Sequence, residues 1–163
     1  MPGVRSVRAG FTLVELLIAI AIVGILSAIA IPNYLRYLEK NKEITAISDI
    51  VTIAGKLKGI MMENPEALPA GLAQINVGNY LPLIDPWGNP YQYLRLYGLT
   101  KPQALAAGCR RKQNITPVST DFDLYSMGPD GVTEVNLKSA KAKDDIVRGD
   151  DGAYVGVANG FEP

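Results

Sequence analysis

The chain has 163 residues, which is enough for one small domain and an additional segment. Its 16 basic and 16 acidic side chains balance, and this argues against a general nucleic-acid-binding protein, which would carry a basic excess. It contains no histidine and one cysteine, Cys109, so histidine-based catalysis, an internal disulfide and a four-cysteine zinc site are excluded.

The first predicted element is an apolar helix over residues 11–31, whose only charged side chain is Glu15. At about 1.5 Å per residue this helix would be about 31 Å long, enough to cross a bilayer core of about 30 Å. Arg5 and Arg8 precede it without any acidic residue. The positive-inside rule therefore predicts that the N-terminus stays in the cytoplasm and that the rest of the chain is exported.

Two ordinary explanations of this apolar run remain open. The basic start, the apolar stretch and Ala28-Ile29-Ala30 fit a cleaved signal peptide. The length of the run also fits a plain single-span membrane anchor. Both explanations leave Glu15 unaccounted for, because a lone carboxylate in an apolar segment is costly and usually marks a function.

The residues around Glu15 resemble the processing site of type IV prepilins and type II secretion pseudopilins, in which a short basic leader precedes a sequence such as GFTLVE at 10–15. The resemblance implies a leader at residues 1–10, cleavage by a prepilin peptidase between Gly10 and Phe11, and methylation of the new Phe11 amine. It also implies that Glu15 pairs with the Phe11 amine of a neighbouring subunit. Such a pair would neutralise the buried carboxylate and set the register of a fibre.

The helix is predicted to continue beyond the apolar run, to residue 62. Pro32 permits a kink because it removes one backbone donor. The predicted helix therefore spans 11–62, with 11–31 in the membrane or fibre core and 32–62 amphipathic. Apolar residues at helical spacing predict the stripe that packs on the rest of the chain: Ile44, Ile47, Val51, Ala54, Leu57 and Met61.

Residues 63–163 are predicted to form a globular head. Residues 68–85 are rich in Gly, Pro and Asn and are expected to be a loop. Residues 91–96 and 121–126 alternate as strands do, and GPDG at 128–131 predicts a turn. The predicted fold class is α+β, with a small antiparallel sheet laid across the C-terminal half of the long helix.

Two stretches of the head, DPWGNPYQY at 85–93 and DFDLYSMGPDG at 121–131, resemble the major pseudopilin of type II secretion systems, within the type IV pilin-like superfamily. The resemblance implies a structural subunit without enzymatic activity, which polymerises with its own copies into a helical periplasmic pseudopilus and drives export of folded proteins. The implied partners are the prepilin peptidase, the minor pseudopilins, the inner-membrane secretion platform and the inner membrane. The segment 97–120 and the tail after Asp145 depart from the family pattern.

These departures keep other functions open: a type IV pilin for adhesion, motility or DNA uptake, a membrane-anchored calcium-dependent binding module, or an anchored enzyme. An enzyme would need paired carboxylates, and Asp121 and Asp123 share one face of a predicted strand, although solvent-facing acids explain them equally well. The basic run 110–112 is expected to be a solvated loop. Cys109 is expected to be a small buried or idle side chain.

Acidic residues gather after the second predicted strand, and carboxylates are ligands that calcium prefers. Their spacing does not match an EF-hand, so composition alone favours a solvated acidic loop. The resemblance to the major pseudopilin implies a structural calcium ion in this loop, with side chains and backbone carbonyls as ligands. The implied side chains are Asp130, Asp144 and Asp145, and the implied carbonyls are those of Met127 and Val132.

Overall fold

A computed structural model describes residues 10–75 and 81–162 of the chain, so the predicted leader at residues 1–10 lies outside the described residues except for Gly10. By its internal contacts the chain divides into two compact units, Met1–Lys40 and Asn41–Pro163. The boundary falls inside the long helix rather than at its end. The second half of the helix belongs to the head because its buried face forms part of the head's core.

The long helix, α1, spans Leu13–Glu63 and has Pro32 in its interior. The prediction placed this helix over 11–62. In the first unit its large apolar side chains are exposed, from Leu13 at 74% to Leu38 at 39%. The first unit is therefore a helix whose apolar surface no other described part of that unit covers.

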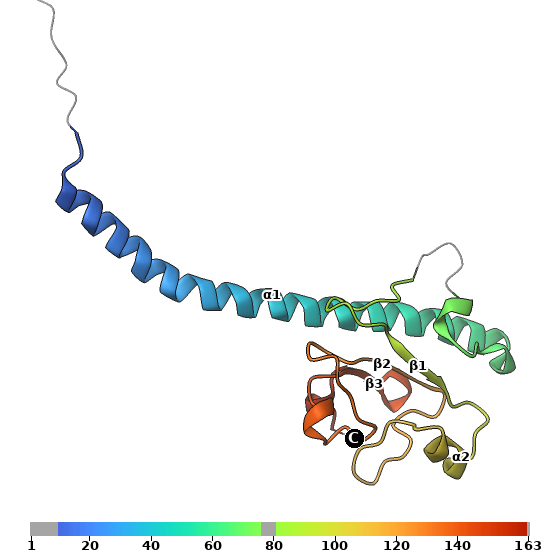
Figure 1. The fold of residues 1–163 in the computed structure, drawn as a ribbon. Helices are drawn as coiled ribbons and strands as arrows, with labels where there is room; N and C mark the ends of the chain where they lie inside the picture. Colours follow the sequence, from blue (N-terminus) through green and yellow to red (C-terminus); the bar gives the residue numbers. More distant parts are fainter. Residues whose placement is uncertain (1–9, 76–80, 163) are drawn as a thin grey trace, which may run out of the picture. The chain divides into compact units, whose positions relative to one another are not determined.

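The second unit contains a four-stranded antiparallel sheet in the order β1-β2-β3-β4. Figure 1 labels its first three strands. The strands are β1 Gln92–Arg95, β2 Phe122–Ser126, β3 Ile146–Gly149 and β4 Tyr154–Val157. A short helix, α2, spans Lys101–Ala106 between the first two strands. Together with α1 this sheet confirms the predicted α+β class, and β1 and β2 lie where strands were predicted.

The strands β3 and β4 and the helix α2 were not predicted. Both strands lie in the unusual tail, where short β-branched stretches flank the turn at 149–152. The signal for α2 is a capping box, in which Thr100 and Gln103 bond reciprocally at the helix start. Short elements of this kind carry too few residues for their periodicity to stand out.

The main core lies between the second half of α1 and the sheet, where Ile50, Ile53 and Leu57 pack with Phe122 and Leu124. The predicted stripe was therefore partly wrong. Its members Ile44 and Val51 are 55% and 53% exposed, whereas Ala46, Ile50 and Ile53, outside the prediction, are fully buried. Apolar residues occupy more than one stripe of this helix, and packing against the sheet decides which stripe is buried.

The opposite side of the sheet carries a second apolar cluster. It joins Val147 of β3 to Val118, Leu137, Ala158 and Phe161, which come from the connecting segments. A substituent at Gly149 of β3 would lie 2.8 Å from the Phe161 ring, so only a glycine allows this close approach. The connecting segments are thus packed onto the sheet.

Candidate functional site

The start of α1 holds the predicted processing residues. Gly10 and Phe11 precede the helix and are exposed, Phe11 by 87%. Glu15 caps its own helix: its Oε2 accepts from the backbone N–H and the hydroxyl of Thr12, each at 2.8 Å, and its N–H donates to the Thr12 hydroxyl at 3.2 Å. The sequence analysis overlooked this partner, although the Thr-x-x-Glu spacing is the signature of a capping box.

The apolar part of α1 is long and apolar enough to cross a membrane, and none of its most apolar stretch is buried in the structure. A soluble protein rarely leaves so large an apolar surface uncovered, so lipid or neighbouring copies are the natural environment of this segment.

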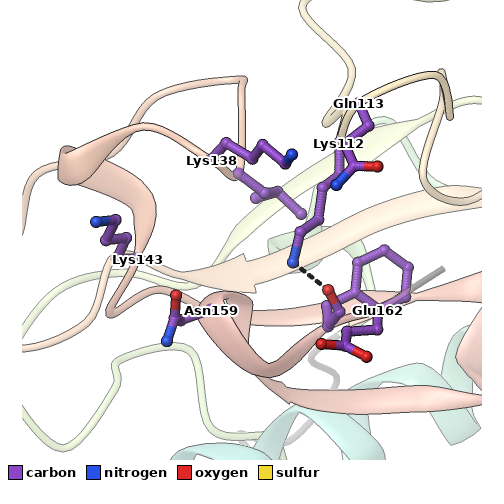
Figure 2. A pocket seen from close by; sticks show the side chains of 8 residues that line it. Lys112, Gln113, Lys138, Lys143, Asn159 and Glu162 are labelled. Atoms are coloured by element: carbon purple, nitrogen blue, oxygen red, sulfur yellow. Dashed lines mark hydrogen bonds between the residues drawn. The ribbon is translucent and has the colours of Figure 1, made fainter.

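The head also contains an open pocket of about 480 Å³ near the C-terminus (Figure 2). The buried Lys112 ammonium in its wall donates to the carbonyl oxygen of Ala158 at 3.1 Å and to that of Phe161. Lys112 thus ties the C-terminal segment to the head. The expectation that the run 110–112 is solvated was wrong for Arg110 and Lys112, which are buried, whereas Arg111 is exposed. The pocket is lined by Lys112, Gln113, Leu137, Lys138, Lys143, Asn159, Phe161 and Glu162.

Asp121 and Asp123 are both 2% exposed, which excludes the alternative that they are solvent-facing acids. Asp121 is held by the Arg148 guanidinium through two hydrogen bonds of 2.8 Å and by Lys58 of α1 at 3.0 Å. Burial raises the pKa of Asp121, but these bonds and charges outweigh burial and lower it to about 2. Asp121 is therefore an ionised anchor between α1 and the sheet.

Asp123 has a different environment. Its Oδ2 accepts from the backbone N–H of Arg110 at 2.6 Å, and its buried Oδ1 has no hydrogen-bond partner among the described residues. Burial is the main cause that raises the pKa of Asp123 to about 7. The neighbouring Cys109 is also buried, and burial raises the pKa of its thiol. Neither group is open to a substrate, as catalysis would require.

The register of the sheet places two of the five predicted calcium ligands opposite each other. Ser126 of β2 pairs with Ile146 of β3, so the next residues along, Met127 and Asp145, face each other where the strands end. Gly128 then turns with φ +67°, and a Cβ at this position would lie 2.5 Å from the Asp144 carbonyl oxygen. The turn after β2 therefore lies in close contact with the acidic pair Asp144 and Asp145, which precedes β3.

Asp145 is fully buried, and its Oδ1 lacks a hydrogen-bond partner among the described residues. Its Oδ2 accepts from the hydroxyl of Thr133. Burial raises the pKa of Asp145 to about 6, and the negative charges of Asp144 and Asp130 add to this. A buried acceptor without a partner beside two further acids fits a cation, because a cation would satisfy the oxygen and offset the repulsion.

Of the other predicted ligands, Asp130 and Val132 are exposed, whereas Met127 and Asp144 are half-buried. Asp130 is exposed, and its Oδ1 accepts from the N–H of Val132 at 2.8 Å, which shapes the turn. Within residues 10–75 and 81–162, no three His, Cys, Asp or Glu side chains gather closely enough to hold a metal by themselves. A cation here would therefore need backbone carbonyls, and those of Met127 and Val132 are the predicted ones.

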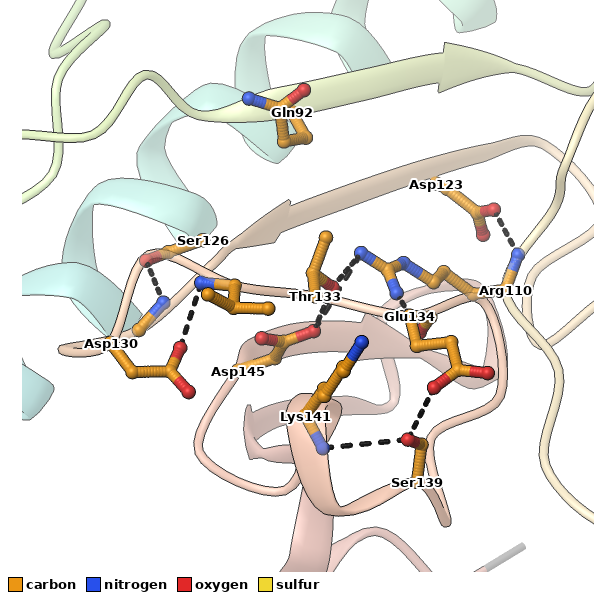
Figure 3. A network of polar contacts seen from close by, with 12 residues as sticks. Gln92, Arg110, Asp123, Ser126, Asp130, Thr133, Glu134, Ser139, Lys141 and Asp145 are labelled. Carbon is orange, nitrogen blue, oxygen red and sulfur yellow. Dashed lines mark hydrogen bonds and ion pairs between the residues drawn. The ribbon is translucent and has the colours of Figure 1, made fainter.

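The side chain of Arg110, which comes from the segment 97–120, reaches into this loop, and the sequence did not predict this. Its side chain is buried, and the guanidinium donates to the Thr133 hydroxyl at 2.5 Å and to the carbonyl of Glu134 (Figure 3). Its Nη2 lies 3.6 Å from Asp145 Oδ2, and its Cζ lies 3.5 Å from the ring centre of Tyr125. A basic residue in a polar run carries no local signal that it will be buried.

A prokaryotic N-terminal methylation motif matches residues 5–31. The type II secretion system core protein G of Pseudomonas aeruginosa is 34% identical over 144 residues, which cover 78% of this chain and 87% of that protein. The protein of the same name from Escherichia coli (strain K12) is 30% identical over 141 residues, which cover 76% of this chain and 83% of that protein. The type IV major fimbrial protein FimA of Dichelobacter nodosus is 36% identical, but the match covers only 39% of this chain and 40% of that protein. No solved structure matches the chain.

Proposed function

The chain belongs to the family of the type II secretion system core protein G, and on this premise we propose that it acts as the structural subunit of a helical pseudopilus. The observation that carries the proposal is the apolar first half of α1, whose large apolar side chains are exposed among the described residues. Packing these helices against neighbouring copies buries them, and a head-to-tail arrangement that does not close yields a fibre. The head then lies in the periplasm, and fibre growth drives folded proteins outward.

The N-terminus is the proposed processing site. A prepilin peptidase cuts between Gly10 and Phe11, and the Phe11 amine is methylated. The methylation motif at residues 5–31 and the exposure of Gly10 and Phe11 support this, because a peptidase needs access to an extended backbone. The retained apolar helix anchors the subunit in the inner membrane until assembly.

Glu15 is the proposed assembly residue. In the single chain its carboxylate caps α1 through Thr12, and this satisfies the carboxylate only while water or a lipid headgroup region surrounds it. In the fibre the carboxylate would pair with the Phe11 amine of a neighbouring copy. A charge buried among apolar helices needs such a partner. The offset between neighbouring subunits that brings Glu15 to the Phe11 amine is therefore favoured over other offsets.

We further propose a structural calcium ion in the loop between β2 and β3. Asp130, Asp144 and Asp145 would hold it together with the carbonyls of Met127 and Val132. Support comes from the Asp145 Oδ1, which is buried without a partner among the described residues. Calcium would neutralise three neighbouring acids and order a loop with little core. Calorimetric titration with calcium chloride tests this, and an absence of binding would contradict it.

The type IV pilin alternative is less well supported. The fimbrial relative matches only 63 residues, or 39% of this chain. The core protein G relatives match most of the chain, head included. An anchored enzyme has no support from Asp121 and Asp123, which bind internal partners. A structural role therefore remains the proposal.

The decisive experiment is the N-terminal mass of the protein purified from its native host. The proposal predicts a chain that begins with N-methylated Phe11. A chain that begins at Ile31 would identify an ordinary signal peptide instead, and an uncut chain would identify a plain anchor. Either result would overturn the pseudopilus proposal, because both leave no free Phe11 amine for assembly.

A further inference from the structure

The Arg110 guanidinium reaches the proposed calcium loop from the 97–120 segment, in which the chain departs from the family pattern. Both backbone groups of Arg110 are hydrogen-bonded. The Arg110 N–H donates to the Asp123 carboxylate of β2, and the Arg110 carbonyl accepts from the N–H of Val118 at 2.9 Å. The following residue, Arg111, exchanges backbone bonds of 2.9 Å with Val135 and Leu137. The segment is thereby bound to the connection between β2 and β3.

The side chain is held as firmly as the backbone. The guanidinium stacks over the Tyr125 ring and donates to the Thr133 hydroxyl, which in turn donates to Asp145 Oδ2. A second donor bonds the Glu134 carbonyl. The positive charge therefore lies 3.6 Å from one carboxylate oxygen of Asp145, while the other oxygen has no partner among the described residues.

We propose that Arg110 is a built-in counter-ion of Asp145, which keeps the loop folded when calcium is absent and weakens calcium binding when it is present. The inference rests on the proposed calcium site. The physical reason is that a cation and a guanidinium compete for the same buried negative charge. Calcium would approach Asp145 Oδ1, which has no partner among the described residues. The ion would be repelled by the Arg110 guanidinium, which lies 3.6 Å from Asp145 Oδ2.

The experiment compares three variants of the full chain in detergent: Arg110→Gln, Arg110→Lys and, as the control, Arg111→Gln. Arg111 is exposed, and its replacement leaves the same backbone bonds in place. Thermal unfolding is followed in EGTA and in excess calcium chloride. Calcium binding is measured by calorimetry with the metal alone.

Arg110→Gln is expected to lower Tm in EGTA by about 10 °C, because it leaves a buried carboxylate without a counter-ion. Excess calcium should restore most of this loss, and calcium should bind about tenfold tighter than to the parent chain. Arg110→Lys keeps the charge, so its calcium affinity should stay near that of the parent. It also keeps the test decisive if Arg110→Gln does not fold. Arg111→Gln should behave as the parent does.

An unchanged Tm of Arg110→Gln in EGTA would overturn the inference, and so would a lowered Tm that calcium does not raise. The second would make Arg110 a packing residue only. Equal calcium binding by the parent and Arg110→Gln refutes the counter-ion role but leaves the calcium site standing. Absence of binding in both refutes the calcium site as well. The pseudopilus proposal is tested separately by the N-terminal mass.

Discussion

At the scale of single residues, two aspartates one position apart have opposite electrostatic roles. Asp121 is bound by two cations, which hold its pKa near 2, whereas Asp123 receives one backbone hydrogen bond and burial raises its pKa to about 7. Both are buried to the same extent. The difference arises from the partners, because ionisation in a buried site is favourable only where opposite charge compensates the loss of water.

These environments predict opposite pH dependence. The folded pKa of Asp121 lies below its unfolded value of 3.8, so its stabilisation is present above about pH 4 and is lost as the pH falls toward 2. The folded pKa of Asp123 lies above 3.8, so its contribution is lost as the pH rises through about 7.

Urea unfolding of Asp121→Asn and Asp123→Asn between pH 3 and pH 8 tests this pair. Asp121→Asn should cost about 3 kcal/mol at pH 7 and less near pH 3, because it breaks a buried ion pair. Asp123→Asn should stabilise by about 2 kcal/mol at pH 8 and have little effect at pH 3, because it removes an unfavourable ionisation. Parallel pH profiles of the two variants would contradict the assignment.

At the scale of elements, α1 performs two tasks along one continuous helix. Its first part is exposed on all sides within its unit, whereas its second part buries one face against β2 and β3. The buried face contains Ile50, Ile53 and Leu57, while Val51, one position from Ile50, is half exposed. A helix turns about 100° per residue, so neighbouring apolar residues can face the core and the solvent.

Ile53→Ala and Val51→Ala form a matched pair that tests this orientation. Ile53→Ala should lower the free energy of unfolding by about 2–5 kcal/mol, because it opens a cavity in the core. Val51→Ala should change it by about 0.5 kcal/mol or less, because the side chain is largely in solvent. Chemical unfolding of the full chain measures both. A larger loss from Val51→Ala than from Ile53→Ala would mean that the helix packs through the stripe predicted from the sequence.

At the scale of the whole molecule, stability and assembly belong to different units. The head in Asn41–Pro163 has its own core, and the unit Met1–Lys40 has an uncovered apolar helix. A subunit built in this way can fold by itself and still require neighbours or lipid for its first unit. The proposed assembly residue, Glu15, lies in that unit, apart from every residue that stabilises the head.

Glu15→Gln should therefore abolish fibres without unfolding the head. The amide keeps an acceptor for the Thr12 cap but cannot form an ion pair with the neighbouring Phe11 amine. Fibres are counted by electron microscopy in cells that overproduce the protein, and head stability is measured by urea unfolding. Normal fibres would contradict the proposed pairing, and a destabilised head would contradict the separation of the two units.

The local part of the candidate site was predictable, but the partners of its residues were not. The motif at residues 10–15 and the acidic pair at 144–145 can be recognised directly in the sequence, because each consists of adjacent residues. The predicted calcium ligands stay a prediction, although sheet register brings Met127 and Asp145 face to face. Arg110 could not be assigned to this loop, because its contact with Asp145 joins residues far apart in the sequence.

The sequence by itself determined the long apolar helix, its processing motif, the first two strands and the family, because these features are written in short-range periodicity and in motifs. Only the tertiary structure decided which stripe of α1 is buried, that β3 and β4 complete the sheet, and that Asp121, Asp123 and Arg110 are internal. The physical reason is that burial and ion pairing depend on which distant segments meet. A pattern of period two or 3.6 gives the faces of an element, but the rest of the fold selects the face that becomes the core.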